Sequence, residues 1–452
     1  MQIERRLAEF VCSLQAEDVP VSAQRVLRRM VLAVAGTGVA GAAEDGIGAL
    51  RDLLLEAGGA PQATTLVFGD RLPAHAAAQF NGTMCRALDY CDAMAPGPHI
   101  GSALVPAALA AAELAGGCPG SEFMAALAAG AELSSRLNLN EAQYDGFDPT
   151  GIAVVFSAAA AASRILGLTP EQTLHALALA FNRCGGSFQS HVDGSLGVRI
   201  LQGWVAEAGV QCAQLAQRGV TGPVNFLAGH YGYGHLYGRD TVDLQTLGAG
   251  LGTEWLLHRV VFKKYPSCGV TQGVTELALG LVEEGLQADD VQSAEVRLPP
   301  YACKLVGKPF DPGPNPRVDA QFSAAYCVAN AFLRRASKLQ HFAPGQVDDP
   351  MLRQLIDRIA VRADPAMNAR GHAAVDLSVT TRAGRTFERS LDIPPGFPGA
   401  ELDDAQHQAR FEDCLAYAPR PLSRMQVDRF LDALHGLAGL DDVRVLVPML
   451  VQ

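Results

Sequence analysis

The sequence predicts a mostly α-helical protein with one large all-helical domain and a smaller α+β domain. Over about the first 250 residues, Ala, Leu and Gly recur at the spacing of helices that pack against one another. After Tyr265, short runs of alternating apolar and polar residues appear between further helices, which is typical of half-buried strands. The chain has 452 residues and is 49% hydrophobic, so it is long enough to bury more than one core.

The first part of the chain predicts a packed bundle of helices. Its many Ala and Gly residues allow neighbouring helices to approach closely, because small side chains shorten the distance between helix axes. The segment ATTLVFGD, residues 63–70, is the one early strand that we expect. The helices are expected at residues 4–15, 22–39, 46–56, 74–89, 102–115, 121–137, 152–166, 170–182 and 200–218.

The second part predicts strands interleaved with helices, and the Pro/Gly-rich segments PFDPGPNP and IPPGFPG predict loops. We expect the second loop to lead the chain back to the first domain. This gives an all-helical domain of residues 1–264 completed by 400–452, and an α+β domain of residues 265–399. Strands are expected at 293–299, 358–364, 375–381 and 387–393, and helices at 272–284, 320–335, 349–358, 403–417 and 423–437.

Composition excludes several classes of function. The 47 acidic residues outnumber the 36 Lys and Arg residues, giving a net charge of −11, and no basic stripe occurs, so we expect no nucleic-acid partner. The overall field repels anions, so an acidic substrate requires local Lys or Arg side chains.

No signal-peptide core and no membrane-length apolar run is evident, which predicts a cytoplasmic protein. The ten cysteines lack zinc-site spacing and are expected to be reduced thiols without a metal.

The segment ALDYCDAMAPGPHIGSALVPAALAAAE, residues 87–113, is the strongest candidate for a site. Asp89 and Asp92 lie three residues apart at the expected end of a helix, where the helix dipole disfavours negative charge. We therefore expect a raised carboxyl pKa and a carboxyl that can hold a proton. His99 precedes an apolar helix whose free N–H groups attract anions, so a substrate carboxylate is expected beside an imidazole that exchanges protons near neutral pH.

Four blocks of the chain, in order, resemble the MmgE/PrpD family, which includes 2-methylcitrate dehydratase, cis-aconitate decarboxylase and iminodisuccinate epimerase. The resemblance extends nearly from end to end. It implies a homodimer, a large helical domain that is discontinuous in sequence, a smaller α+β lid, an active site between them, and catalysis without metal or organic cofactor. The blocks are NGTMCRALDYCDAMAPGPHIGSALVPAALAAAE, FDPTGIAVVFSAAAAASRILGLTPEQTLHALALA, GWVAEAGVQCAQLAQRGVTGP and FKKYPSCGVTQGV.

The resemblance implies that Asp89 and His99 face the substrate, and Lys263 in FKKYPSC matches a family lysine at the hinge between the domains. A lysine partly buried there has a lowered pKa and can act as a base. Tyr144 precedes the DPT block and is a candidate phenolic acid or base. Two arginines, Arg199 and Arg183, are candidate clamps for a substrate carboxylate, because a guanidinium group grips a carboxylate with two hydrogen bonds.

The sequence also departs from the family at expected substrate-binding positions. Ala93 stands where the family commonly has threonine, and Asp148 and Gln272 stand where it frequently has histidine. Val198 replaces a frequent lysine, with Arg199 adjacent. These differences argue against citrate-like tricarboxylates as substrates, and favour an acid with fewer carboxylates or one with a cationic nitrogen that pairs with Asp148.

Three classes of function remain open from the sequence. The first is a lyase, a dehydratase or decarboxylase, that acts on a small carboxylic acid with a general base, a general acid and carboxylate clamps. The second is an isomerase, such as an epimerase of an amino- or imino-dicarboxylate, which needs two proton-transfer groups on opposite faces of one stereocentre. The third is a non-catalytic relative that keeps only the fold and the dimer.

Overall fold

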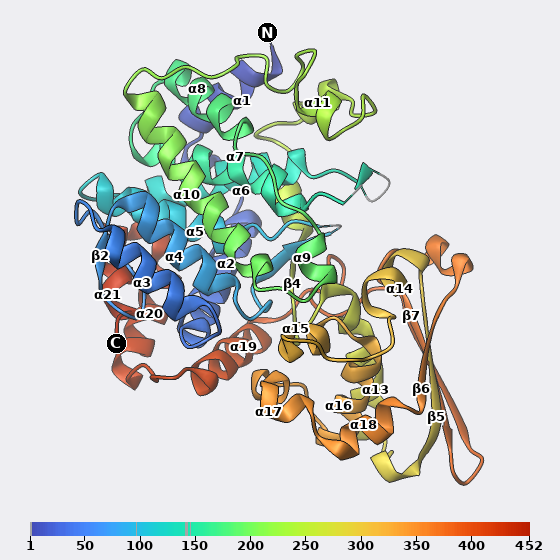
Figure 1. The fold of residues 1–452 in the computed structure, drawn as a ribbon. Coiled ribbons are helices and arrows are strands. Elements are labelled where there is room, and N and C mark those ends of the chain that lie inside the picture. The colour runs from blue at the N-terminus through green and yellow to red at the C-terminus, as the bar shows by residue number, and fades with distance from the viewer. Residues whose placement is uncertain (1, 96, 141–142, 145) are drawn as a thin grey trace.

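A computed structural model describes residues 2–95, 97–140, 143–144 and 146–452. The described residues form two large hydrophobic cores and two small hydrophobic clusters, and Figure 1 shows the larger helical part beside a smaller part that ends in a sheet. The larger core combines residues between Leu7 and Phe262 with residues between Leu402 and Leu450. The smaller core draws on residues between Cys268 and Val379. The mostly α-helical fold with a smaller α+β part is therefore confirmed.

Small residues let the central helices of the larger part pack closely. Helix α10 lies against α4 and α7. A Cβ atom on Gly203 of α10 would lie 2.1 Å from Thr83 Oγ1, and one on Gly209 would lie 2.3 Å from the Ala158 Cβ. The longer helices are α1 (Ile3–Ser13), α2 (Val21–Gly41), α3 (Ile47–Ala57), α4 (Ala74–Arg86), α5 (Gly101–Leu114), α6 (Gly120–Leu137), α7 (Pro149–Ile165), α8 (Pro170–Phe181) and α10 (Gly197–Gln217), with one-turn helices α9 (Gln189–Val192), α11 (Tyr233–Leu236) and α12 (Leu244–Leu247).

The smaller part is a four-stranded sheet packed against helices. The strand order is β6-β5-β7-β8, in which β5 and β6 are parallel and the other pairs are antiparallel. Alternate residues of β7 are buried against the helices, as its sequence pattern predicts. The strands are β5 (Val291–Leu298), β6 (Ile359–Ala363), β7 (Val375–Thr381) and β8 (Thr386–Leu391), and the helices are α13 (Gln272–Glu283), α14 (Pro300–Val306), α15 (Pro316–Gln321), α16 (Ala324–Arg334), α17 (Pro344–Val347) and α18 (Pro350–Ile356).

A short strand pair of the larger part lies where the loop that returns from the smaller part crosses it. Strand β3 (Asp92–Met94) pairs antiparallel with β4 (Val260–Phe262), although the sequence pattern does not predict either strand. The loop that returns from the smaller part lies against β4, where the Phe262 amide donates to the carbonyl of Gly396 at 3.0 Å. Gly396 has a φ of 87°, and a Cβ atom there would lie 1.9 Å from the Phe262 oxygen. Glycine is therefore required at this crossing.

The chain returns to the larger part after this loop. Helix α19 (Asp404–Tyr417) packs against α2, and α20 (Arg424–His435) and α21 (Leu446–Met449) complete the larger core (Figure 1). In the part of the chain that the structure describes, no helix is long and apolar enough to cross a membrane.

Two expected elements differ from the structure. The expected helix at 320–335 is broken after Gln321, because the Ser323 side chain accepts the Tyr326 amide at 3.2 Å and so starts a new helix. The expected strand at 63–70 pairs with β2 (Arg71–Leu72) only over β1 (Ala63–Thr64), and Val67 forms a separate bridge with Val451.

Candidate active site

The segment between α4 and α5 places Asp89 beside Lys263. Helix α4 ends at Arg86, earlier than the expected end at Asp89, and Asp89 adopts a left-handed conformation with a φ of 50°. The pairing of β3 with β4 sets Asp92 opposite Phe262, so the next residue, Lys263, lies against the turn that holds Asp89. The local backbone thus brings together two residues that are 174 positions apart.

Asp89 is the centre of a buried cluster of charges. Its Oδ1 atom lies 2.7 Å from Lys263 Nζ and also pairs with Arg86. The Lys263 ammonium donates a second hydrogen bond to the backbone oxygen of Asp89 at 2.8 Å. Burial alone raises the pKa of Asp89, but the positive charges of Arg86 and Lys263 outweigh it, so the net pKa is well below its usual value. Asp89 is a carboxylate here, and the expectation that it holds a proton is wrong.

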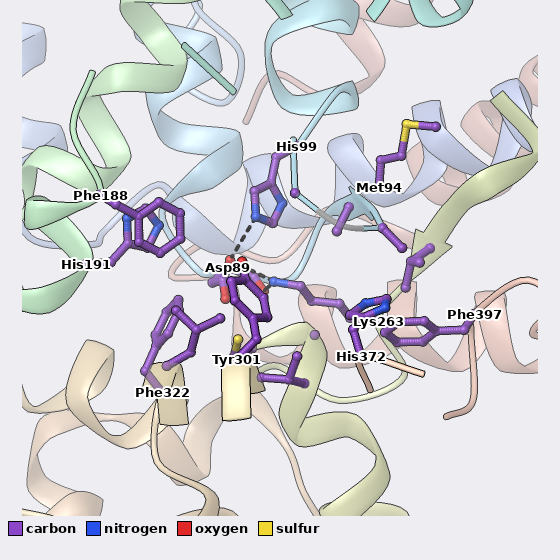
Figure 2. A pocket seen from close by; sticks show the side chains of 18 of the residues that line it. Asp89, Met94, His99, Phe188, His191, Lys263, Tyr301, Phe322, His372 and Phe397 are labelled. Carbon is purple, nitrogen blue, oxygen red and sulfur yellow. Dashed lines mark hydrogen bonds and ion pairs between the residues drawn. The ribbon is translucent and has the colours of Figure 1, made fainter. Parts of the chain in front are cut away.

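His99 lies next to this cluster in a fixed orientation. Its Nδ1 atom is 2.7 Å from the carbonyl oxygen of Asp92 and must carry a proton to donate to it. Its Nε2 atom lies 3.8 Å from Asp89 Oδ1. Burial, followed by the charges of Arg86 and Lys263, lowers the pKa of His99 well below its usual value. The neutral ring therefore presents an unprotonated Nε2 toward Asp89 (Figure 2).

The backbone of His99 is held as firmly as its ring. Its amide donates to Thr150 Oγ1 at 3.1 Å, and its carbonyl accepts from Gln202 Nε2 at 2.7 Å. The Asp92 carboxylate binds the start of helix α5, where it accepts hydrogen bonds from the amides of Ile100 and Gly101 at 2.9 to 3.1 Å. Burial raises the pKa of Asp92, in the expected direction, but this side chain caps a helix instead of lining the cavity.

A cavity of about 90 Å³ opens beside Lys263 and His99. It lies between the two cores, because its walls come from the α4–α5 segment, the 186–196 region and β4 of the larger part and from α14, α15 and the return loop of the smaller part. A volume of this size holds about six water molecules, which fits a small molecule rather than a polymer. Of the residues expected from the sequence, Asp89, Ala93, His99, Asp148 and Lys263 line it.

The two candidate arginine clamps do not line this cavity. Arg199 is buried, where its Nη2 atom lies 3.2 Å from Glu44 Oε2 and its Nη1 atom donates to the carbonyl of Asp45 at 2.8 Å. Arg317, on α15 of the smaller part, pairs with the same Glu44 oxygen at 3.0 Å. The Glu44–Arg317 pair therefore links the two parts, and Arg199 pairs with Glu44 from within the larger part. Arg183 is exposed just after α8.

Tyr144 and Gln272 also lie outside the cavity lining. The Tyr144 hydroxyl donates to Asn138, and its side chain is close enough to Gly97 to touch any Cβ there. The buried Gln272 amide accepts from the Tyr265 amide at 2.9 Å and donates to the Tyr265 carbonyl at 3.0 Å. Gln272 thus braces the loop that follows Lys263.

Several residues that line the cavity were not expected from the sequence. His191 lies in the one-turn helix α9 and its ring stacks on Phe188, with centroids 4.3 Å apart. Tyr301 and His372 reach the cavity from the smaller part. Isolated residues in short helices and loops carry no sequence signal, so the fold alone reveals them. The sequence does give a signal for Arg86. It lies three residues before Asp89 on an expected helix, a spacing that predicts an ion pair between the two side chains.

Asp148 supports the far side of the cavity from Lys263. Its Oδ1 atom accepts the Thr150 amide at 2.8 Å and so caps α7, while its Oδ2 atom lies 3.9 Å from His191 Nδ1. Burial lowers the pKa of His191, although Asp148 acts in the opposite direction. Among the described residues, no group of three His, Cys, Asp or Glu side chains is arranged to hold a metal ion.

The structure thus has a larger helical part and a smaller α+β part, with the cavity between their two cores. Residues 5–245 match the model of the MmgE/PrpD N-terminal domain, and residues 265–430 match that of the MmgE/PrpD C-terminal domain. The chain belongs to the MmgE/PrpD family, as its sequence blocks predict.

Among individual relatives, the cis-aconitate decarboxylases of Homo sapiens and Mus musculus are 27% and 26% identical to this chain. Each alignment covers 84% of this chain, and 80% and 79% of the relatives. A cis-aconitate decarboxylase of Aspergillus terreus is 22% identical over 85% of this chain and 82% of its own length. These relatives support a lyase-type activity on a small carboxylic acid.

Proposed function

We propose that this protein is a decarboxylating lyase that acts on a small unsaturated carboxylic acid. The observation that carries the proposal is the fixed group of His99, Asp89 and Lys263 at the wall of a cavity between the two domains. It places a proton-transfer group beside a cation that can bind a carboxylate. The cis-aconitate decarboxylases among the relatives favour loss of carbon dioxide over loss of water.

The chemistry requires one electron sink and one proton. When carbon dioxide leaves, a C–C bond breaks and its electron pair stays on the substrate, delocalised over the neighbouring double bond. The Lys263 ammonium stabilises the negative charge that remains. A proton from His99 Nε2 then forms the new C–H bond, and the imidazole returns to its neutral form. Each turnover therefore consumes one proton.

The low pKa of His99 in the free protein is compatible with this role. Burial and the positive charges of Arg86 and Lys263 keep the ring neutral. A bound substrate carboxylate adds a negative charge next to Lys263, which raises the pKa of His99 and favours protonation in the complex. Asp89, with Oδ1 3.8 Å from Nε2, stabilises the imidazolium while it exists.

The test is incubation of the purified protein in deuterated buffer with a panel of small acids. The panel contains mono-, di- and tricarboxylic acids and amino- and imino-dicarboxylates. Release of carbon dioxide with one deuterium in the product, followed by NMR, is the expected result. Loss of water from a hydroxy acid instead would identify a dehydratase. Failure of every acid to react would contradict a catalytic role.

An isomerase is the second candidate, and one observation favours it. His191 lines the cavity on the side away from Lys263, so a substrate between them has a titratable group on each side (Figure 2). Deuterium exchange at a stereocentre without release of carbon dioxide would identify this activity.

We also propose that the protein works as a homodimer without a metal. We expect incubation with EDTA to leave activity and the melting temperature unchanged, because the chemistry above uses only side chains. Analytical ultracentrifugation before and after treatment should give the mass of two chains. A stoichiometric metal found by elemental analysis, or a monomer at working concentration, would contradict this.

A further inference from the structure

The cavity offers very little positive charge to its occupant. Among the described residues that line this cavity, Lys263 is the one permanent cation, while Lys304 and Lys308 line an adjoining cavity that shares Phe188, His191, Leu305 and Phe322 with it. Its ammonium has three N–H groups, and two of them are directed to the carboxylate and carbonyl oxygens of Asp89 at 2.7 and 2.8 Å. Arg86 lies behind Asp89 and does not line the cavity. One N–H group remains for a substrate, which suits a single carboxylate.

In the free protein the other ionisable groups in the lining do not add to this charge. Asp89 and Asp148 are acidic and repel further carboxylates. Burial lowers the pKa of the three lining histidines, His99, His191 and His372, and so favours their neutral forms. A second or third carboxylate in the cavity would lose its water without gaining a permanent cation, which is strongly unfavourable.

The remaining wall is apolar and rich in aromatic rings. Phe188 and Phe322 pack on His191, Phe188 stacked at 4.3 Å and Phe322 edge-on at 5.5 Å between centroids. Figure 2 shows this group on the opposite side of Asp89 from the Lys263 chain. Tyr301 and Phe397 add rings, and further lining residues are aliphatic: Met94, Val261, Val270 and Leu305.

We propose that the acid bound here is a monocarboxylate whose remaining part is apolar and flat, either aromatic or conjugated. Its carboxylate lies at Lys263, and its apolar body lies against Phe188, His191 and Phe322. Aromatic rings prefer such offset and edge-on contacts. Because Phe188 belongs to the larger domain and Phe322 to the smaller one, the apolar body contacts both domains. The proposal rests on the proposed function, since it names the substrate class of the same site.

The test measures binding equilibria, so it does not depend on turnover. Isothermal titration calorimetry compares phenylacetate with butanoate, succinate and propane-1,2,3-tricarboxylate. We expect phenylacetate to bind at least about tenfold more tightly than either polycarboxylate. Equal or tighter binding of the tricarboxylate would overturn the proposal. Carbon dioxide release without this order of affinities would leave the lyase intact and refute only the substrate class.

Two substitutions assign the two ends of the ligand. Phe322→Ala should weaken binding of phenylacetate about tenfold and leave the affinity for butanoate within about twofold, because only the ring contacts this wall.

Lys263→Met should weaken binding of both acids by at least about tenfold. Lys264→Met is the matched control, because Lys264 pairs with Glu276 at 2.8 Å and does not line the cavity. Circular dichroism checks each fold, and if Lys263→Met is unfolded, Phe322→Ala decides alone. No change in phenylacetate affinity for Phe322→Ala would overturn the placement.

Discussion

His99 owes its chemistry to two neighbours that act on different ring atoms. The Asp92 carbonyl accepts a hydrogen bond from Nδ1–H and thereby leaves Nε2 unprotonated in the neutral ring. The Asp89 carboxylate faces Nε2 and balances any positive charge that forms there. The ring is therefore oriented by hydrogen bonding on one side and tuned by charge on the other.

Replacing His99 should separate catalysis from stability. We expect His99→Gln to lower kcat by about 10²- to 10⁴-fold, which is the usual contribution of one proton-transfer group. The melting temperature should change by only a few degrees, because the ring makes one hydrogen bond to the backbone. Steady-state kinetics and thermal unfolding followed by circular dichroism measure both. His235→Gln, at an exposed pair with Asp240, is the control. Full activity in His99→Gln would remove this residue from the mechanism.

Replacing Asp89 should, in contrast to replacing His99, strongly lower the stability of the fold. Asp89→Asn leaves Arg86 and Lys263 buried without their shared counter-charge, so we expect the free energy of unfolding to fall by about 3 to 5 kcal/mol. Asp404→Asn is the control, because it breaks a pair with Arg29 in which the carboxylate is 89% exposed. It should change the free energy of unfolding by less than about 1 kcal/mol. Urea denaturation compares the two. An unchanged stability for Asp89→Asn would mean that the ion cluster does not support the fold.

At this scale the sequence predicts some site residues and misses others for a physical reason. Asp89, His99 and Lys263 sit in long blocks of the family pattern, so their positions could be inferred. His191 and Tyr301 reach the cavity through tertiary packing, which no local pattern encodes. Arg199 is the opposite case. The sequence predicts that it binds a substrate carboxylate, but its guanidinium group pairs with Glu44 instead.

At the scale of secondary structure, the β3–β4 pair is the element on which the site depends. Each strand has only three residues, too few for an alternating pattern to be distinguished from a loop. Most longer elements, from α1 to α20, lie close to their expected ranges because their periodic patterns extend over several turns or strand repeats. Length therefore decided which elements could be predicted.

The cap of α5 gives a prediction at the same scale. Asp92→Ala leaves the amides of Ile100 and Gly101 buried without their carboxylate acceptor, and we expect a loss of about 2 kcal/mol in the free energy of unfolding. Asp92→Asn keeps one acceptor oxygen and should lose less. Denaturant titrations of both variants measure the difference. Equal stability of Asp92→Ala and the unchanged protein would show that carboxylate burial cancels the benefit of the cap.

For the whole molecule, buried histidines should control stability at acidic pH. Burial, with nearby Arg charges, lowers the pKa of His341 to about 4 and of His407 to about 3, and the pKa values of His99, His191 and His372 are also lowered. The unfolded chain, with a histidine pKa near 6.5, binds more protons below that pH. Stability is therefore complete above about pH 6.5 and is lost as the pH falls toward the folded values.

Urea denaturation at pH 7.0 and 5.5 measures this effect, and each histidine contributes at most about 1.4 kcal/mol per pH unit. His407→Phe removes one of these groups, so its stability should fall less steeply. A stability that is constant from pH 7.0 to 5.5 would contradict the burial of neutral histidines.

Because the larger domain is discontinuous in sequence, its two segments leave the ribosome at different times. Its core contains residues up to Phe262 and then from Leu402, with roughly 140 residues of chain between them. At ribosomal rates of about 5 to 20 residues per second, synthesis of this stretch takes roughly 7 to 28 s, so every helix that precedes Phe262, α2 included, waits at least that long for α19. During that interval an apolar surface on α2 is unshielded on the nascent polypeptide, while the consecutive residues of the smaller domain are being synthesised. This chain is thus expected to spend part of its synthesis as a client of the chaperones that bind exposed helices.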